Sequence, residues 1–453
     1  MVDTRDQASG DSATEGVRPS GVKPIAAAVA GNVLEWYDIA IFGYYSVIIG
    51  QLFFPMGNPA VATLFAVGTY GLGFVIRPVG AVVLGSLGDT RGRKAALTVT
   101  IATMAVGTAA IGLAPTYEQA GIVGPIVIIF ARLLQGFSAG GEMGSATAFL
   151  YEHAAPNRRS FAASFQQASQ ALAMLMGSLT AVAVTGALSE DQALSWGWRI
   201  PFLAGLIIAP IGIYIRRCTH EPAEFSEARA RAPLPAHPLK ILIRENRTEL
   251  MAAFGLFMCW AVLQNFFLIF MPTHAVSALG IDQAGALFSN CLALVVVLVL
   301  TPCFGLLADR IGGRPIQMVG AGLLLAGSLP ALLWLASDPS VARLIIVQLA
   351  IAVPLAAFTG PAPAALALLF PVRIRSSGLA ISHSVAGATF GGLAPFVTTS
   401  LTLATGDPAS PAWYIMFACT AALIALFAVR RQSLRTDRAE RNSTFHHCTE
   451  GNL

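Results

Sequence analysis

The sequence predicts an all-α integral membrane protein with twelve transmembrane helices in two pseudo-symmetric six-helix bundles and with both termini in the cytoplasm. Three observations support this fold class. Only 11% of the 453 residues are charged, against about 25% in soluble proteins. The charges collect in short clusters between apolar runs of about twenty or more residues, the length that spans a bilayer. Finally, the loop after the second apolar run is repeated after the eighth.

Apolar runs between the charge clusters give twelve candidate spans. A soluble fold is excluded, because its charges would be spread along the chain. Residues 1–23 are polar and lack the apolar core of a signal peptide, so we expect a disordered tail followed by a retained first span. The spans lie near residues 24–54, 60–87, 95–114, 121–151, 161–187, 199–216, 248–277, 284–307, 316–336, 342–370, 377–402 and 411–430.

The distribution of Lys and Arg predicts the orientation. Of the 28 such residues, 24 fall in the two tails and in the connections that follow spans 2, 4, 6, 8 and 10. The positive-inside rule places these connections in the cytoplasm, and an even number of spans brings both termini to the same side. Of the other four residues, Arg199 and Arg343 lie on the opposite side, and Arg77 and Arg132 lie within spans.

Two loops are repeated at matching places in the two halves of the chain. GSLGDTRGRK (85–94) follows span 2 and GLLADRIGGR (305–314) follows span 8, while PNRRS (156–160) has its counterpart in PVRIRS (371–376). Short Gly/Arg turns can recur by chance, but here each repeated loop occupies the same place in its half of the chain. Two related halves are typical of secondary transporters, whose substrate site lies between them. We expect a disordered tail (1–23), a first bundle (24–216), a cytoplasmic linker (217–247), a second bundle (248–430) and a cytoplasmic tail (431–453).

The repeated G-x-x-x-D loop resembles the signature of the major facilitator superfamily. Further segments narrow the resemblance to metabolite–proton symporters, a bacterial branch that imports organic acids, betaine-like osmolytes and shikimate. This resemblance implies a multi-pass protein of the bacterial inner membrane that works as a monomer by alternating access. It runs in order from about residue 25 to 430. The segments are GNVLEWYDIAIFGYY (31–45), GFVIRPVGAVVLGSLGDTRGRK (73–94), RLLQGFSAGGEMG (132–144), WGWRIPF (196–202) and ATFGGLAP (388–395).

Within this branch, three segments are most similar to citrate and tricarboxylate carriers: SFQQASQ (164–170), LTLATGDPASPAW (401–413) and the apolar span after WGWRIPF. The resemblance therefore favours import of a citrate-like di- or tricarboxylate by proton symport. Another metabolite, such as betaine, proline, shikimate or a ketoacid, stays open as the substrate. An efflux antiporter would share the fold but would favour an aromatic cavity with few fixed cations.

Candidate proton-coupling residues lie in the first half. An ionisable residue at the centre of a bilayer costs about 2.5–3.5 kcal/mol, so each such residue needs a partner or a function. Glu35 and Asp38 are three residues apart and share a helical face. Two carboxylates this close cannot both ionise easily, so one should hold a proton, as a proton carrier requires. Glu142 is a third candidate. The alternative is that Arg77 and Arg132 pair permanently with the acids and brace the bundle.

Candidate substrate-binding residues are cationic or amide side chains. Guanidinium groups bind both oxygens of a carboxylate, which suits Arg77 and Arg132 to an anionic substrate. Amides near the midplane suit hydroxyl and carboxyl groups, although such residues often only hold helices together. A single buried histidine could titrate near neutral pH or be structural. The further candidates are Asn32, Gln166, Gln170, Gln264, Asn265 and His383.

The repeated loops carry the candidate cytoplasmic gate. In the superfamily, the aspartate of this loop is taken to pair with a helix start and an arginine of the neighbouring bundle, which closes the inner mouth. The resemblance transfers this role to Asp89 and Asp309, although such a charge cluster can also be a topology signal. Thr90 stands where a basic residue is usual, so the first latch is expected to be weaker. The flanking arginines are Arg91 and Arg93 in the first loop and Arg310 and Arg314 in the second.

Other functional classes lack their characteristic patterns. No G-x-x-x-x-G-K-[ST] loop is present, so nothing indicates a nucleotide cofactor or drive by ATP. We expect no metal site, no other cofactor and no nucleic-acid partner. An enzyme would need a nucleophile–base pair or a metal cluster, and a sensor would need a sizeable output domain. The expected partners are a small-molecule substrate, protons and the lipid bilayer.

Overall fold

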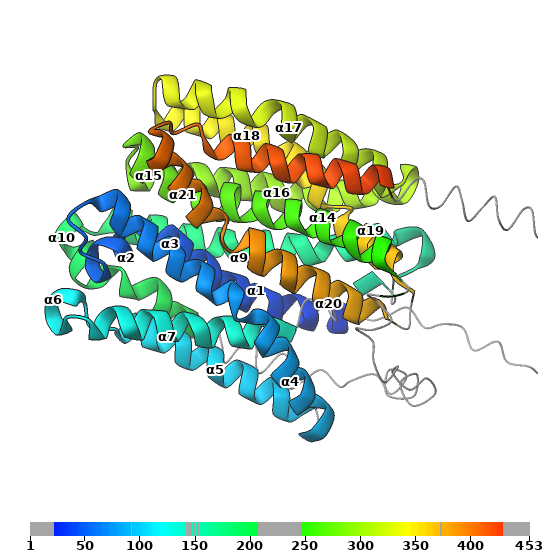
Figure 1. Ribbon diagram of the computed structural model, residues 1–453, viewed down its shortest axis with the longest axis horizontal. Coiled ribbons are helices and arrows are strands. Elements are labelled where there is room, and N and C mark those ends of the chain that lie inside the picture. The colour runs from blue at the N-terminus through cyan, green and yellow to red at the C-terminus, as the bar shows by residue number, and fades with distance from the viewer. Residues whose placement is uncertain are drawn as a thin grey trace, which may run out of the picture.

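The computed structural model describes residues 22–206 and 244–428, except for residues 92, 142–146, 148–149, 152–153, 245 and 372–373. All regular structure in these residues is helical. Seven of the described helices are long and apolar enough to cross a membrane. Figure 1 shows the first half, blue to teal, beside the second half, green to red, with their helices roughly parallel. The first and last described residues lie at the same end of the molecule, called here the predicted cytoplasmic end.

The first half consists of apolar helices with short polar connections. The side chain of Asn58 accepts a hydrogen bond from Ala60 N and caps α3, which satisfies one of the free N–H groups of that helix start. The helices are α1 (Val22–Tyr44), α2 (Ser46–Phe53), α3 (Pro59–Val75), α4 (Arg77–Arg91), α5 (Arg93–Leu113), α6 (Tyr117–Ala120), α7 (Val123–Ser138), η1 (Ala139–Gly141), η2 (Pro156–Arg158), α9 (Arg159–Ala187), α10 (Glu190–Gln192), η3 (Ala193–Gly197) and a helix at 199–206.

The second half has the same character. The carboxylate of Asp282 caps α16 and the hydroxyl of Ser340 caps α18, while Gly280, at φ 67°, ends α15 in a left-handed conformation that favours glycine. The helices are α14 (Arg247–Leu263), η4 (Gln264–Phe270), α15 (Met271–Leu279), α16 (Gln283–Ile311), α17 (Gly313–Ser337), α18 (Val341–Thr359), α19 (Ala362–Leu369), α20 (Arg375–Ala386), η5 (Gly387–Gly391), α21 (Ala394–Thr405) and a last helix, Pro411–Ala428.

Several predicted spans are interrupted helices rather than continuous ones. Span 342–370 is divided between α18 and α19, where Pro361 stands at the start of α19. Span 377–402 contains the wide turn η5, and Pro395 lies in the first turn of the following α21. Proline cannot donate a backbone hydrogen bond, so these residues are tolerated at helix starts. The sequence pattern predicted the lengths of the apolar spans. It did not predict the π-helical segments η4 and η5 within them.

The two halves pack against each other along several helices. α9 of the first half runs beside α16 of the second, α3 lies against η5 and α21, and α1 contacts η4 and α15. At the predicted cytoplasmic end, Gly305 of α16 meets Ser164 of α9. At the opposite end, Gly43 meets Ile269, and Thr273 Oγ1 donates a hydrogen bond to Gly43 O at 2.8 Å. The halves are therefore in contact at both ends.

Glycines let α7 approach α3 and α4 closely. A Cβ on Gly136 would overlap the carbonyl oxygen of Gly73 on α3, and a Cβ on Gly140 would overlap that of Arg77 on α4. A Cβ on Gly80 would in turn overlap the carbonyl oxygen of Phe137. This packing fixes α4, which carries Arg77, against α7, which carries Arg132. Small residues at helix contacts are a common means of close packing within membranes.

Candidate functional site

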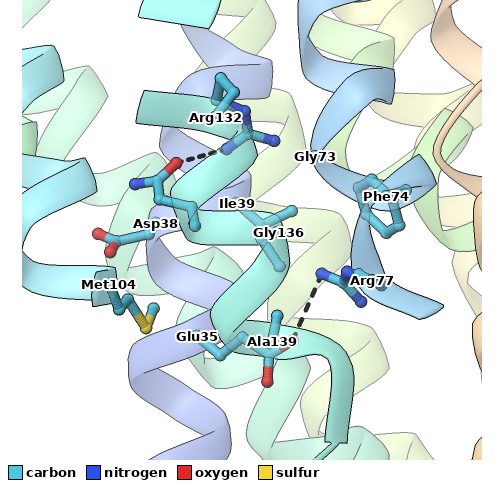
Figure 2. A pocket seen from close by; sticks show the side chains of 11 residues that line it. Glu35, Asp38, Ile39, Gly73, Phe74, Arg77, Met104, Arg132, Gly136 and Ala139 are labelled. Carbon is cyan, nitrogen blue, oxygen red and sulfur yellow. Dashed lines mark hydrogen bonds and ion pairs between the residues drawn. The ribbon is translucent and has the colours of Figure 1, made fainter. Parts of the chain in front are cut away.

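Four charged side chains of the first half line one small cavity. Glu35 and Asp38 come from α1, Arg77 from α4 and Arg132 from α7, and all four are buried. Figure 2 shows them on adjoining turns of these helices. The cavity has a volume of about 10 Å³, which is room for about one water molecule. The remaining lining residues are Ile39, Gly73, Phe74, Met104, Gln135, Gly136 and Ala139.

Arg77 forms an ion pair with Glu35. Its Nη2 lies 3.4 Å from Glu35 Oε1, and Figure 2 shows the bond between the two helices. The guanidinium also lies 4.1 Å from the ring centroid of Phe74, a cation–π contact. Phe74 in turn packs against the backbone of Gly392, directly after η5 of the second half. The second half therefore touches the residue that covers the Arg77 guanidinium.

Arg132 lies among neutral groups. Nη1 donates to Gln135 Oε1 at 2.9 Å and Nη2 donates to Tyr70 O at 3.3 Å. The guanidinium lies 4.5 Å from the ring centroid of Phe42 and 5.1 Å from that of Tyr70. Among the described residues, no carboxylate forms an ion pair with Arg132, and its Nε has no hydrogen-bond partner. The two arginines thus differ: one is paired with an acid and the other is not.

Asp38 receives its hydrogen bond from a neutral side chain. Thr108 Oγ1 on α5 donates to Asp38 Oδ2 at 2.5 Å. Gln135 Nε2 donates to the same Thr108 hydroxyl at 3.0 Å. Asp38 is therefore linked to Arg132 through two side chains and not by a direct ion pair. The alternative reading of the sequence, in which each acid pairs with an arginine, therefore describes Glu35 in this structure and does not describe Asp38.

The predicted amides form a separate network between the halves. Gln264 Nε2 on η4 donates to Gln170 Oε1 on α9 at 3.0 Å. Trp260 Nε1 on α14 donates to Gln167 Oε1 at 2.8 Å and to Gln264 Oε1 at 2.7 Å. The Nε2 atoms of Gln167 and Gln170 have no partner among the described residues, although both side chains are fully buried. These two donors are available to an acceptor that enters between the halves.

The other predicted polar residues have defined positions. Asn32 Nδ2 donates to Ser169 Oγ at 2.6 Å and to Gln166 O at 3.1 Å, which joins α1 to α9 within the first half. Asn265 Oδ1 on η4 accepts a hydrogen bond from Tyr70 OH on α3. His383 on α20 stacks edge-on against Phe257 on α14, with ring centroids 5.2 Å apart. None of these side chains lines the charged cavity.

The second predicted latch joins the two halves. Asp309 on α16 accepts hydrogen bonds from the backbone N–H groups of Ser160 and Phe161, at 2.7 and 3.0 Å. These groups belong to the first turn of α9, where a carboxylate meets free N–H groups and the positive end of the helix dipole. Arg310 is exposed, and Arg314 Nε donates to Leu426 O within the second half. The side chains of Asp89, Arg91 and Arg93 lie outside the described part, as does Glu142.

Sequence reasoning missed five side chains of these networks. Gln135 stands three residues after Arg132, so the shared helical face could have indicated it. Thr108 and Tyr70 lie in apolar runs, and only their neighbours in space reveal them. Gln167 and Trp260 join the two halves through a contact that neither span shows by itself.

Known proteins share both the sequence and the fold. The sequence profile of the Major Facilitator Superfamily matches residues 26–342. The citrate-proton symporter of Salmonella typhi is 34% identical over 403 residues, which cover 88% of this chain and 92% of that protein. The glycine betaine/proline/ectoine/pipecolic acid transporter OusA of Dickeya dadantii (strain 3937) is 33% identical over 404 residues, which cover 87% and 80% of the two chains.

The fold also matches that of a solved transporter. The crystal structure of a D-xylose-proton symporter aligns with a TM-score of 0.71 at 19% identity, over 90% of this chain and 97% of that one. This fold has twelve spans in two six-helix bundles, as predicted, and the protein is a multi-pass transporter of the bacterial inner membrane and not an enzyme. The chain belongs to the Major Facilitator Superfamily, in its branch of metabolite–proton symporters.

Proposed function

We propose that the protein imports a small organic acid by proton symport, with a citrate-like di- or tricarboxylate as the favoured substrate. The observation that carries this proposal is the Arg132 guanidinium, which is buried and bonded only to neutral groups among the described residues. A buried charge without a partner is strongly unfavourable. A substrate carboxylate would supply the missing negative charge through two parallel hydrogen bonds.

The amide network offers further contacts for such a substrate. Gln167 and Gln170 each hold an Nε2 donor without a partner in the described residues, at the place where α9 faces α14 and η4. Donors suit the acceptor oxygens of additional carboxyl or hydroxyl groups. The charged cavity has room for only about one water molecule. Substrate binding at Arg132 therefore requires this cavity to widen, a change that we expect to accompany the movement of the two halves in alternating access.

The acids of α1 provide a route for protons. We assign protons to Asp38 and Glu35, of which Glu35 also balances the charge of Arg77, and Glu142 is a further candidate outside the described residues. An anion that enters a cell with a negative interior moves against the membrane potential, which costs about 2.3 kcal/mol per charge per 100 mV. Each proton carried with it removes one charge from this balance. A trianion would therefore need about three protons for neutral transport.

An osmolyte is the second candidate substrate. The relative OusA, at 33% identity, is a transporter of glycine betaine, proline, ectoine and pipecolic acid. Such a zwitterion would place its carboxylate on Arg132. Its ammonium group would need an acid or an aromatic face, and Glu35 and Trp36 lie on α1 close to the charged cavity.

Uptake by the purified protein in liposomes tests the proposal. With an inwardly directed proton gradient, radiolabelled citrate should accumulate, and a protonophore should abolish the accumulation. Unlabelled citrate should compete, while glycine betaine and proline should not. If glycine betaine or proline is accumulated and citrate is not, the organic-acid assignment is wrong.

Two arginine variants give the matched comparison. Arg132→Gln should lower citrate uptake at least about a hundredfold, because a lost charge-assisted hydrogen bond is worth about 1.5–3 kcal/mol and two are lost. Arg343→Gln removes an arginine whose side chain is 26% exposed and pairs with Asp338 at 3.1 Å, far along the chain from the cavity. Its uptake should stay at the wild-type rate. Equal uptake by Arg132→Gln and wild type would remove Arg132 from the substrate site.

A further inference from the structure

Three hydrogen bonds connect Arg132 with Asp38 and run in one direction. Arg132 Nη1 donates to Gln135 Oε1 at 2.9 Å. Gln135 Nε2 donates to Thr108 Oγ1 at 3.0 Å. Thr108 Oγ1 donates to Asp38 Oδ2 at 2.5 Å. This hydrogen-bonded chain crosses from α7 to α5 and on to α1. It joins a cation to an acid through two neutral side chains.

The direction of this chain follows from the chemistry of its ends. A guanidinium has only donors, so Gln135 must turn its oxygen toward Arg132 and its NH₂ group toward Thr108. The Thr108 oxygen then accepts, which leaves its single O–H to donate to Asp38. All four side chains are at most 6% exposed. Hydrogen-bonded groups in such surroundings polarise one another, because little water competes.

We propose that Thr108 and Gln135 are positioning residues that couple protonation of Asp38 to carboxylate binding by Arg132. This inference rests on the proposed function and adds to it two residues and an order of events. With Asp38 ionised, the chain ends in a negative charge and stabilises the guanidinium. When a proton from the outside joins the carboxylate, that stabilisation is lost and Arg132 favours a substrate carboxylate instead.

The coupling must act in both directions. If protonation of Asp38 strengthens substrate binding by a given factor, substrate binding strengthens proton binding by the same factor. Proton and anion would then enter together and leave together, as symport requires. The charge of the proton and the charge of the anion would then offset each other while both cross the membrane. A carrier that binds the two independently would instead let the proton leak without substrate.

Other titratable and charged groups also face Asp38. Glu35 and Tyr37 lie on α1 itself, Arg132 lies on α7 and Arg77 on α4. On α5 the neighbour is the neutral Thr108, and the helix at 199–206 presents the backbone of Gly205. Replacing Thr108 leaves all of these charges in place. A change in pH dependence in such a variant therefore reports on the hydrogen-bonded chain.

Citrate binding as a function of pH tests the coupling. The full-length protein in lipid nanodiscs is titrated with citrate by calorimetry between about pH 5.5 and 7.5. Wild-type affinity should rise by up to about tenfold per unit fall in pH when one proton is taken up with the ligand. Thr108→Val, which keeps the shape of the side chain but removes the hydroxyl, should show less than half this slope. Ionisation of citrate itself is common to all variants and cancels in the comparison.

Matched variants separate coupling from a structural role. Thr108→Ser should restore the wild-type slope, and Gln135→Met should behave like Thr108→Val. The double variant should lose no more slope than either single one, because the two residues act in series. Thr103→Val removes another hydroxyl from α5, one that bonds to Val99 O in its own helix, and should leave the slope unchanged. A wild-type slope in Thr108→Val, whatever its affinity, overturns the inference.

A readout without citrate keeps the test independent of the substrate assignment. Infrared titration follows the carboxylic-acid band of Asp38, assigned by its loss in Asp38→Asn. Arg132→Gln should shift the titration midpoint of this band, and the shift should fall by more than half in the Thr108→Val background. Equal shifts in both backgrounds overturn the inference. Absence of citrate binding together with a reduced shift would instead reject the substrate assignment and support the coupling.

Discussion

The Arg77 guanidinium lies 3.4 Å from the Glu35 carboxylate, and this buried pair links α4 to α1 beside the second half of the molecule. The ring of Phe74 covers the guanidinium and is itself in contact with Gly392. A rearrangement of the two halves would therefore act directly on the ion pair. Asp38, one turn further along α1, is bonded to Thr108 and has no ion-pair partner in the described part of the chain. The two acids of α1 thus have different surroundings and are expected to have different roles.

Replacement of the acids should separate exchange from accumulation. Glu35→Gln and Asp38→Asn should each retain citrate counterflow, which needs no net proton movement, and should lose protonophore-sensitive accumulation. Counterflow is measured in liposomes loaded with unlabelled citrate. Accumulation is measured in liposomes under a proton gradient. Uphill accumulation by both variants would contradict the assignment of protons to these acids.

Glu35→Gln should also destabilise the protein, because it leaves the buried Arg77 without its partner. Breaking a buried ion pair from one side costs about 3–5 kcal/mol. The double variant Glu35→Gln/Arg77→Gln should recover part of this loss. Thermal unfolding in detergent compares the three melting temperatures. The single variant should melt below both the wild type and the double variant. A single variant as stable as the wild type would show that the ion pair contributes little.

Asp309→Asn should weaken closure at the predicted cytoplasmic end. The carboxylate accepts from Ser160 N and Phe161 N across the two halves, and hydrogen bonds to a charged group are worth about 1.5–3 kcal/mol each. A cysteine introduced at Ser164 should react about tenfold faster with a membrane-impermeant maleimide. Asp282→Asn is the matched control, because Asp282 caps the other end of the same helix within the second half. Equal labelling in the Asp309→Asn variant and its parent would contradict the latch.

Gly43→Ala should block closure at the opposite end. The added Cβ would overlap Cγ2 of Ile269 on η4, so the halves could not approach as they do here. Citrate uptake should fall at least tenfold, and Ile269→Ala in the same protein should restore part of it by removing the overlapping atom. Gly322→Ala, where a Cβ meets nothing within 4 Å, should transport normally. Failure of Ile269→Ala to restore any uptake would argue against a steric cause.

Gly140→Ala should destabilise the first half and displace Arg77. A Cβ at this position would overlap the carbonyl oxygen of Arg77 and come within 2.6 Å of Ala81 N. Backbone atoms cannot move aside as a flexible side chain can, so overpacking of this kind costs about 1–3 kcal/mol or more. The melting temperature and the yield of monodisperse protein measure the loss. Gly327→Ala on α17, where a Cβ meets nothing within 4 Å, serves as the comparison.

The twelve spans, the division into two halves and the rarity of buried charges could be predicted from the sequence. Apolar length and charge clustering determine these features, because a bilayer excludes unpaired charges and demands helices of about twenty residues. Glu35, Arg77 and Arg132 themselves stood out for the same reason. The loop repeat also indicated Asp309, whose carboxylate lies against the start of α9 as the resemblance implied.

Tertiary structure alone decided which of these groups are partners. Helical spacing shows that Glu35 and Asp38 share a face, but it does not show which helix lies opposite that face. Glu35 meets Arg77 on α4, which Gly80 and Gly140 hold close to α7 and η1, while Asp38 meets Thr108 on α5. A neutral residue such as Thr108 cannot be recognised as functional within an apolar run, because it has no charge that needs a partner. Only the packing of α5 against α1 and α7 reveals its role.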